Sequence, residues 1–254
     1  MTELPRSHSR HLAEVLAARP DFSRHGRKGV PEIVLTSTKT VPQSLSIAAA
    51  FLRETGRAIL SRVSPELEQA LREEYAQHGS LEWYAASRAA ILRAPGNSVP
   101  PTGGTVGIIT AGTSDLPMAE EAAIVCQEMG CKVETVYDVG VAGLHRLFPP
   151  LERLLDEDVD VIIVAAGMDG ALPSVVSGLV DVAVIGLPTS VGYGMGGKGE
   201  AAILSMLQTC SPGLAVVNID NGVGAGAIAG LIANRAARAR AGLVRGQGQP
   251  GDDR

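Results

Sequence analysis

Five loops in the second half of the chain carry the side chains that could do chemistry. Each follows an apolar run and combines glycine with polar or charged side chains. They are AGTSDLP (111–117), YDVGVAGLHR (137–146), AAGMDGALP (165–173), LPTSVGYGMGGKGE (187–200) and NIDNGVGAG (218–226). Glycine leaves backbone amides exposed, and such amides can bind an anion or lie against a planar ring. The first loop contains no lysine, so it is not the usual loop that binds nucleoside triphosphates.

Each loop also has a simpler interpretation. The GTSD turn at 112–115 could serve only to cap the helix that follows it. Asp169-Gly170 and Asn221-Gly222 are common turn dipeptides, and His145 could be an ordinary helix residue. The recurrence of the same composition after five apolar runs is what indicates a shared site.

The three cysteines differ in their predicted surroundings. Cys126 lies on an apolar helix face and Cys131 at the start of a strand, so both are expected in the core. Cys210 lies where a helix stops before a Ser-Pro-Gly turn, near the loop region. A helix C-terminus raises the pKa of a thiol, so Lys198 or His145 would have to offset that effect. The residues alone leave open whether Cys210 is functional.

These loops are positioned by a regular alternation of elements after residue 104. Strands are predicted at 105–110, 132–137, 159–166, 182–187 and 214–219. Helices are predicted at 115–129, 143–155, 172–180, 199–210 and 224–240. The order predicts right-handed crossovers and a parallel sheet that is covered on both faces. The carboxyl ends of parallel strands meet at one edge, where open α/β sheets bind ligands.

The first 95 residues differ from the rest and predict a smaller, mainly helical α+β region. Residues 14–40 indicate a helix, a basic loop and a short strand, and helices are expected at 42–55 and 64–78. After this region (1–95), we predict a turn-rich linker at 96–104, an α/β catalytic domain at 105–240 and a disordered tail at 241–254.

The composition excludes several classes of protein. The net charge is −5 and aromatic residues make up 3% of the 254 residues, so nucleic-acid binding is not expected. No apolar stretch reaches the roughly 18 residues of a membrane span, and the N-terminus does not resemble a signal peptide. Three cysteines without a CxxC pair argue against a disulfide framework or a zinc ribbon. We therefore expect a cytoplasmic protein that does not bind membranes.

Long motifs in this chain match a known family. They are GTSDLPMAEEA, DVGVAGLHR, AAGMDGALPSVVSGLVDVAVIGLPTSVGYG and MLQTCSPGLAVVNIDNG, together with RKGVPEIVLTSTKT (27–40) and RVSPE (62–66). Over nearly its whole length the chain resembles the LarB family, the nickel-pincer cofactor biosynthesis carboxylases. Residues 104–236 are also similar, more loosely, to the PurE family of aminoimidazole ribonucleotide carboxylases and mutases.

The chain departs from the PurE pattern in an informative way. The GTSD loop at 112–115 resembles the serine-rich PurE loop, and Leu144-His145-Arg146 resembles its Ala-His-Arg segment. The second PurE histidine is missing, because Asp169-Gly170-Ala171 precedes Leu172-Pro173 here. PurE proteins also have no N-terminal region of this kind. Both differences count against ribonucleotide mutase chemistry.

The resemblance implies a PurE-like three-layer fold and a carboxylase/hydrolase that acts on nicotinic acid adenine dinucleotide. The products would be pyridinium-3,5-biscarboxylic acid mononucleotide and AMP, with CO2 or bicarbonate as the carbon source. No tightly bound cofactor is implied, although Mg²⁺ or another divalent ion would suit the hydrolysis. A homo-octamer is implied as well, and the small residues of the helix at 224–240 would allow close packing between subunits.

The resemblance and the loop chemistry together give candidate site residues. Cys210 would be the nucleophile, Asp115, His145 and Asp169 the further catalytic residues, and Asp138 another candidate for proton transfer. Substrate-binding candidates are Gly112, Thr113, Ser114, Asp138, Gly140, Arg146, Gly167, Met168, Gly170, Thr189, Ser190, Tyr193, Lys198, Asn218, Asp220, Asn221, Arg24 and Lys39. Asp220 or Asp169 could instead hold a divalent ion. Arg24 and Lys39 could also belong only to a solvated basic loop.

Two other functions are open at this point. The first is a PurE-type ribonucleotide carboxylase/mutase. The second is a nucleotide-binding module that has the fold without catalysis. The presence of Cys210 and of all five polar loops argues against the second.

Overall fold

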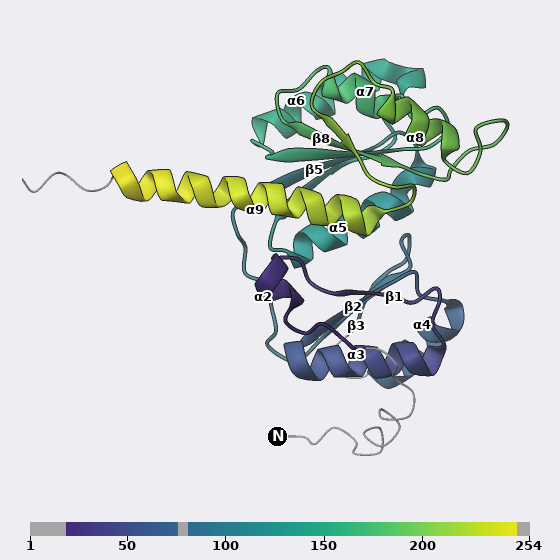
Figure 1. Cartoon of the computed structure of the whole chain (residues 1–254), viewed down its shortest axis with the longest axis vertical. Helices are drawn as coiled ribbons and strands as arrows, with labels where there is room; N and C mark the ends of the chain where they lie inside the picture. Colours follow the sequence, from purple (N-terminus) through teal and green to yellow (C-terminus); the bar gives the residue numbers. More distant parts are fainter. Residues whose placement is uncertain (1–18, 76–80, 248–254) are drawn as a thin grey trace, which may run out of the picture. The chain divides into compact units, whose positions relative to one another are not determined.

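The computed structural model describes residues 19–75 and 81–247, the last five of them by their backbone alone. The chain divides into two compact units, Met1–Ser98 and Val99–Arg254. The division falls inside the linker predicted at 96–104. Each unit has its own sheet (Figure 1). Each also has its own hydrophobic core.

The N-terminal unit is built on a four-stranded sheet in the order β1-β2-β4-β3. Its strands are β1 (Ile33–Leu35), β2 (Arg57–Ser61), β3 (Leu81–Tyr84) and β4 (Ala89–Arg93). Its helices are α2 (Arg24–Lys28), α3 (Val41–Thr55) and α4 (Pro65–Tyr75). The strands β1 and β2 are parallel, and the other pairs are antiparallel. The helices α3 and α4 bury their apolar sides in one core cluster that includes Leu60 and Leu92 of the sheet.

This unit is α+β as predicted, but its strands are more numerous than the sequence indicated. The helices predicted at 42–55 and 64–78 are α3 and α4, and the residues after Tyr75 up to 80 lie outside the described residues. The predicted basic loop contains the short helix α2, which is a correction. Strands β2 to β4 were not predicted, because their state depends on pairing with each other and not on a local pattern.

The second unit has an all-parallel five-stranded sheet in the order β6-β5-β7-β8-β9. Its strands are β5 (Thr105–Thr110), β6 (Lys132–Val136), β7 (Val161–Ala166), β8 (Ala183–Pro188) and β9 (Leu214–Val216). The central strand β7 is buried at every residue, as its continuous apolar run predicts. All five predicted strands are confirmed, and β9 is shorter than expected.

Helices cover both faces of this sheet, which gives three layers (Figure 1). They are α5 (Leu116–Glu128), α6 (Phe148–Asp156), α7 (Leu172–Ser177), α8 (Glu200–Leu207) and α9 (Gly222–Gln247). Figure 1 shows α5 and α9 on one face and α6, α7 and α8 on the other. The fold class predicted from the sequence is confirmed.

The last helix corrects the predicted disordered tail. Residues 241–247 (AGLVRGQ) continue α9, although two of the seven are glycines, which disfavour helix. The remainder of the predicted tail, 248–254, lies outside the described residues. The small residues of α9 pack within the chain. A Cβ on Gly226 would lie 2.5 Å from the Ala122 carbonyl oxygen of α5.

Over the described residues, no helix combines the length and the apolar character that crossing a membrane would require.

Candidate active site

The parallel sheet brings the five predicted loops to one edge. The loops follow β6, β5, β7, β8 and β9 in that spatial order, at the carboxyl ends of the strands. Four residues with positive φ angles lie in four different loops of this edge: Asp138 (60°), Met168 (53°), Lys198 (61°) and Asp220 (55°). Such conformations cost about 1–3 kcal/mol each for residues other than glycine and cluster at functional sites. Three other non-glycine residues among those described, Arg62, Arg88 and Asp158, have positive φ elsewhere, so it is the occurrence of four in the five strand-end loops that marks this edge as the candidate site.

The first loop presents hydroxyl groups at the start of a helix. Thr113 and Ser114 are exposed in a short 3-10 turn, Thr113–Asp115, that leads directly into α5. Gly112 precedes the turn in an extended conformation. Exposed hydroxyls and amides before a helix favour the binding of an anionic group such as a phosphate.

Asp115 behaves differently from its neighbours in this loop. Its side chain is buried, with the residue 3% exposed. Its carboxylate accepts hydrogen bonds from the Thr189 hydroxyl at 2.6 Å and from the Gly112 N–H at 2.8 Å. Burial raises the pKa of Asp115 above its ordinary value, while the hydrogen bonds from Thr189, Gly112 and the Gly167 amide oppose that rise. The carboxylate thus faces protein groups and not the open crevice.

The loop after β6 contains an exposed ion pair. Arg146 donates from Nη1 to the Asp138 carbonyl oxygen at 2.7 Å and to Oδ2 of the same residue at 3.0 Å. His145 is exposed beside Arg146 in a 3-10 segment, Val141–Arg146. Gly140 passes close to the first loop, since a Cβ there would lie 2.7 Å from the Ala111 carbonyl oxygen. These two loops therefore lie against each other.

The loop after β7 presents Asp169 and Met168 to solvent between two buried glycines. A Cβ on Gly167 would lie 2.2 Å from the Val191 carbonyl oxygen, and one on Gly170 would lie 2.5 Å from the Ala202 carbonyl oxygen. Asp169 accepts one long hydrogen bond of 3.4 Å from the Ala171 amide. Its exposed carboxylate is therefore available to a ligand in the crevice.

The loops after β8 and β9 are tied together. The Ser190 N–H donates to Asp220 Oδ1 at 2.8 Å. The side-chain oxygens of Asn218 and Asn221 accept hydrogen bonds from the Ile219 and Gly224 amides, and the second of these contacts caps α9. Two predicted ligand residues, Tyr193 (82% exposed) and Lys198, are exposed in the β8 loop.

Cys210 lies away from this edge within the same chain. The helix α8 runs from the β8 loop back toward the amino end of the sheet and ends at Leu207. Cys210 then precedes β9, whose first residue, Leu214, pairs with Val184 near the start of β8. The thiol is exposed, in contrast to Cys126 and Cys131, which are buried as predicted. The expectation that Cys210 lies near the loops of its own chain is therefore wrong. The helix α8 takes the chain from the carboxyl ends of the strands back to their amino ends before Cys210 is reached.

Family matches agree with this architecture. Residues 105–246 match the family described as AIR carboxylase, and residues 12–94 match the LarB/PurE-like N-terminal domain. The chain belongs to the AIR carboxylase family. The resemblance to LarB and PurE stated from the motifs is thereby confirmed.

Several proteins are similar to this AIR carboxylase family member. An uncharacterized protein from Methanocaldococcus jannaschii is 44% identical over 84% of this chain and 82% of its own length. The N5-carboxyaminoimidazole ribonucleotide mutase of Thermotoga maritima is 31% identical over 50% of this chain and 73% of its own length. The crystal structure of a variant of Treponema denticola PurE2 matches with a TM-score of 0.38 and 20% identity, over 58% of this chain and 96% of that chain.

The basic residues expected to reach the substrate from the LarB/PurE-like domain have partners inside that domain. Arg24 forms an ion pair with Glu32 at 2.7 Å. Lys39 donates from Nζ to the Leu35 carbonyl oxygen at 2.7 Å. Both contacts lie within the N-terminal unit, and the role of Arg24 and Lys39 in substrate binding stays a prediction.

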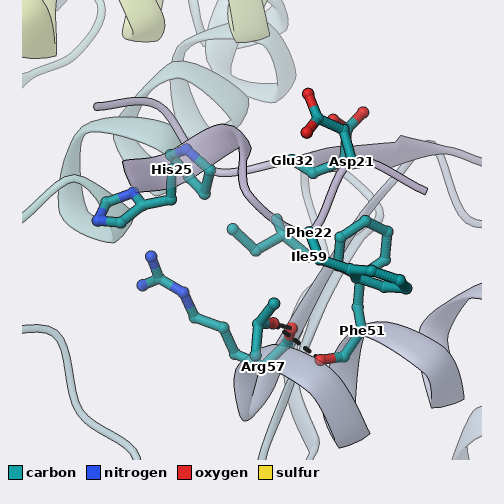
Figure 2. Close-up of a pocket in the computed structure, with 9 residues that line it drawn as sticks. Asp21, Phe22, His25, Glu32, Phe51, Arg57 and Ile59 are labelled. Atoms are coloured by element: carbon teal, nitrogen blue, oxygen red, sulfur yellow. Dashed lines mark hydrogen bonds between the residues drawn. The ribbon is translucent and has the colours of Figure 1, made fainter. Parts of the chain in front are cut away.

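The same domain contains a pocket that sequence reasoning missed. It has about 310 Å³ of space, part of it open to solvent, and is lined by nine residues. Figure 2 shows Phe22 and Phe51 on one side and the basic side chains of His25 and Arg57 on the other. The two phenylalanine rings meet edge to face, with centroids 5.0 Å apart. No sequence motif marks this pocket, because its lining comes from separate elements.

The described residues of this family member contain no group of three His, Cys, Asp or Glu side chains that could hold a metal ion. Asp169 and Asp220, the predicted metal ligands, are thus not part of such a cluster. Nothing in the sequence indicated that Thr189 would meet Asp115, a contact that joins residues 74 positions apart.

Proposed function

We propose that this protein is a LarB-type carboxylase/hydrolase of nicotinic acid adenine dinucleotide. The observation that carries the proposal is the LarB/PurE-like domain at residues 12–94 joined to an AIR carboxylase domain. The substrate would be carboxylated on its pyridinium ring by CO2 or bicarbonate and cleaved at its phosphoanhydride. The products would be pyridinium-3,5-biscarboxylic acid mononucleotide and AMP.

The strand-end edge has suitable groups for this substrate. The hydroxyls of Thr113 and Ser114 and the amides before α5 would bind the phosphate of the mononucleotide half. The exposed carboxylate of Asp169 would remove the ring proton, with His145 as an alternative proton acceptor. The β8 loop, with Tyr193 and Lys198, would cover the ring.

The carboxylation requires a nucleophile, because an electron-poor pyridinium ring does not attack CO2. A thiolate of Cys210 would add to a ring carbon and give a dihydropyridine, which is an enamine. A neighbouring ring carbon would then attack CO2 and form the new C–C bond. Loss of the ring proton to a base and departure of the thiolate would restore the aromatic ring. No electrons are gained or lost overall.

The position of Cys210 has a consequence for this mechanism. Its thiol and the strand-end loops lie at opposite edges of the sheet in one chain, so the thiol would have to come from a neighbouring copy. A homo-octamer, which we also propose, would provide that neighbour. The exposed side chains of Leu204 and Leu207, both 64% exposed on the helix that leads to Cys210, would suit such a contact.

Hydrolysis of the phosphoanhydride would need an attacking water and stabilisation of the developing charge. A divalent ion such as Mg²⁺ would be chemically suitable, and Asp220 or Asp169 would be its candidate ligands. Removing divalent ions with a chelator tests this part separately. If AMP formation stops while carboxylation continues, the ion serves the hydrolysis alone.

Mass spectrometry of the products tests the proposal. Wild type and Cys210→Ala are each given the dinucleotide and ¹³C-bicarbonate. We expect AMP and a labelled mononucleotide from wild type, and no label in the product of the variant. A labelled product from Cys210→Ala would remove the covalent mechanism. If wild type leaves the dinucleotide unchanged, the proposed activity is wrong.

The PurE-type mutase is the alternative, since relatives of that name are about 31% identical to half of this chain. Turnover of N5-carboxyaminoimidazole ribonucleotide by wild type would favour it. Asp169-Gly170-Ala171, where PurE proteins have a histidine, argues against that outcome.

A further inference from the structure

One buried carboxylate joins the loops after β5 and β8, and the loop after β7 packs against this contact. Asp115, 3% exposed, accepts on Oδ2 from the Gly112 N–H of its own loop, after β5. It accepts on Oδ1 from the hydroxyl of Thr189, which follows β8 and is itself 0% exposed. Gly167, after β7, lies close to the same Thr189 hydroxyl, since a Cβ on it would lie 2.7 Å from Thr189 Oγ1. These three strands are adjacent in the sheet, so the carboxylate bridges its central part.

The backbone around this carboxylate is fitted to the contact. A Cβ on Gly167 would lie 2.7 Å from Thr189 Oγ1, so only glycine allows the hydroxyl to stay where it reaches Asp115. The Ser190 amide, one residue further, donates to Asp220 Oδ1. The β8 loop is therefore held from both sides by aspartates that belong to other loops.

We infer that Asp115 is a positioning residue, which holds the loops after β5, β7 and β8 in register so that Thr113, Ser114 and Asp169 face one crevice. A group that exchanges a proton with a substrate must be within hydrogen-bond reach of it. Asp115 instead has its oxygens turned toward protein donors and is shielded from solvent. The inference rests on the proposed function for what the crevice does, but the contacts themselves do not depend on it.

Two substitutions at this position separate positioning from proton transfer. Asp115→Ala removes every acceptor, whereas Asp115→Asn keeps one acceptor oxygen and offers an amide donor toward Thr189, whose hydroxyl can turn to accept. We expect Asp115→Ala to lower kcat/KM for the dinucleotide about 100-fold, as a misplaced site does. We expect Asp115→Asn to stay within about tenfold of wild type, the effect of one weakened hydrogen bond.

Amide hydrogen exchange reports how firmly the loops are held, and it does not require enzymatic activity. In Asp115→Ala, peptides that cover 110–116, 166–171 and 187–192 should exchange faster than in wild type, and in Asp115→Asn they should resemble wild type. The matched control is Asp160→Ala. Asp160 also has a side chain that is 3% exposed, and it accepts from the Thr105 amide and pairs with Arg240 at the amino end of the sheet. This control should leave exchange in the three peptides unchanged.

The results distinguish the possible roles. If Asp115→Asn is as inactive as Asp115→Ala while its loops exchange as in wild type, Asp115 acts through its charge or its proton and the inference is wrong. If Asp115→Ala leaves exchange unchanged, the carboxylate does not hold the loops and the inference is wrong as well. If Asp115→Ala does not fold, Thr189→Val with Thr189→Ser as its conservative partner gives the same comparison. If wild type does not act on the dinucleotide, the proposed function fails and the exchange results still decide the inference.

Discussion

At the scale of single residues, Gly167 is the position where one added methyl group has the clearest consequence. A Cβ there would lie 2.2 Å from the Val191 carbonyl oxygen and would displace the β8 loop. We expect Gly167→Ala to lower the free energy of unfolding by about 1–3 kcal/mol, as overpacking does. Thermal unfolding followed by circular dichroism measures this change.

A matched glycine on α9 provides the control for that measurement. Gly242 lies within the helix, and a Cβ added to it would meet no atom of the described residues within 4 Å. Gly242→Ala should therefore raise the free energy of unfolding by about 0.5–1 kcal/mol, because alanine favours helix. A loss of stability of the same size in both variants would contradict the argument from close packing.

The buried carboxyl of Asp115 makes a second residue-scale prediction, which concerns pH. Its pKa is raised in the fold, chiefly by burial, so folding favours the neutral form. The stability from this group is fully present below the ordinary pKa of about 3.9 and is lost as pH rises through the raised pKa. An asparagine side chain has no proton to release, so Asp115→Asn does not lose stability in this way as pH rises. The free energy of unfolding of Asp115→Asn minus that of wild type should therefore be larger at pH 7 than at pH 3.5. Urea unfolding at both pH values measures it, and a difference that is constant with pH would contradict the prediction.

The loops of the site and the burial of Asp115 differ in how far the sequence predicts them. The loops were predicted because glycine and polar residues recur after apolar runs, and the hydroxyls of Thr113 and Ser114 are exposed as that prediction requires. The burial of Asp115 was not predictable, because it depends on Thr189, which is distant along the chain. Local patterns contain no information on such pairings.

At the scale of elements, α3 of the N-terminal unit has a complete capping box. The Thr40 side chain accepts from the Gln43 N–H at 3.3 Å, and the Gln43 side chain accepts from the Thr40 N–H at 3.0 Å. Thr40→Ala should lower the free energy of unfolding of this unit by about 1 kcal/mol. Trp83 of β3 is the only tryptophan, so its fluorescence during urea unfolding reports on this unit alone. Thr38→Ala, an exposed change in the preceding loop, should have less effect than Thr40→Ala.

The elements also explain where sequence analysis succeeds. The strands β5 to β9 were predicted because strands covered on both faces need continuous β-branched apolar runs. In contrast, β4 has the sequence AAILR, whose composition suits a helix equally well, and its state is decided by pairing with β2 and β3. The predicted tail at 241–254 overlaps the end of α9 because its glycines and polar residues resemble a disordered segment, although residues 241–247 continue the helix.

At the scale of the whole molecule, the separation of Cys210 from the strand-end loops predicts complementation between copies. Ser114→Trp should block the first loop, because Ser114 is exposed and the larger side chain would fill the space before α5. Cys210→Ala should remove the proposed nucleophile. Each variant alone should be inactive in carboxylation. If the two are unfolded and refolded together at equal amounts, about a quarter of the sites in a symmetric assembly should combine an intact loop with an intact cysteine.

Carboxylation of the dinucleotide by the mixture measures this prediction. Recovery of about a quarter of the wild-type rate is expected when the thiol comes from another copy. If the thiol came from the same chain, neither variant would contain a complete site, and the mixture would stay as inactive as its components. The control is a mixture of Ser114→Trp with Ser114→Trp/Cys210→Ala, which contains no intact loop and should show no activity under either arrangement. An inactive first mixture, with an active refolded wild type, would therefore show that the two edges of the sheet do not meet between copies.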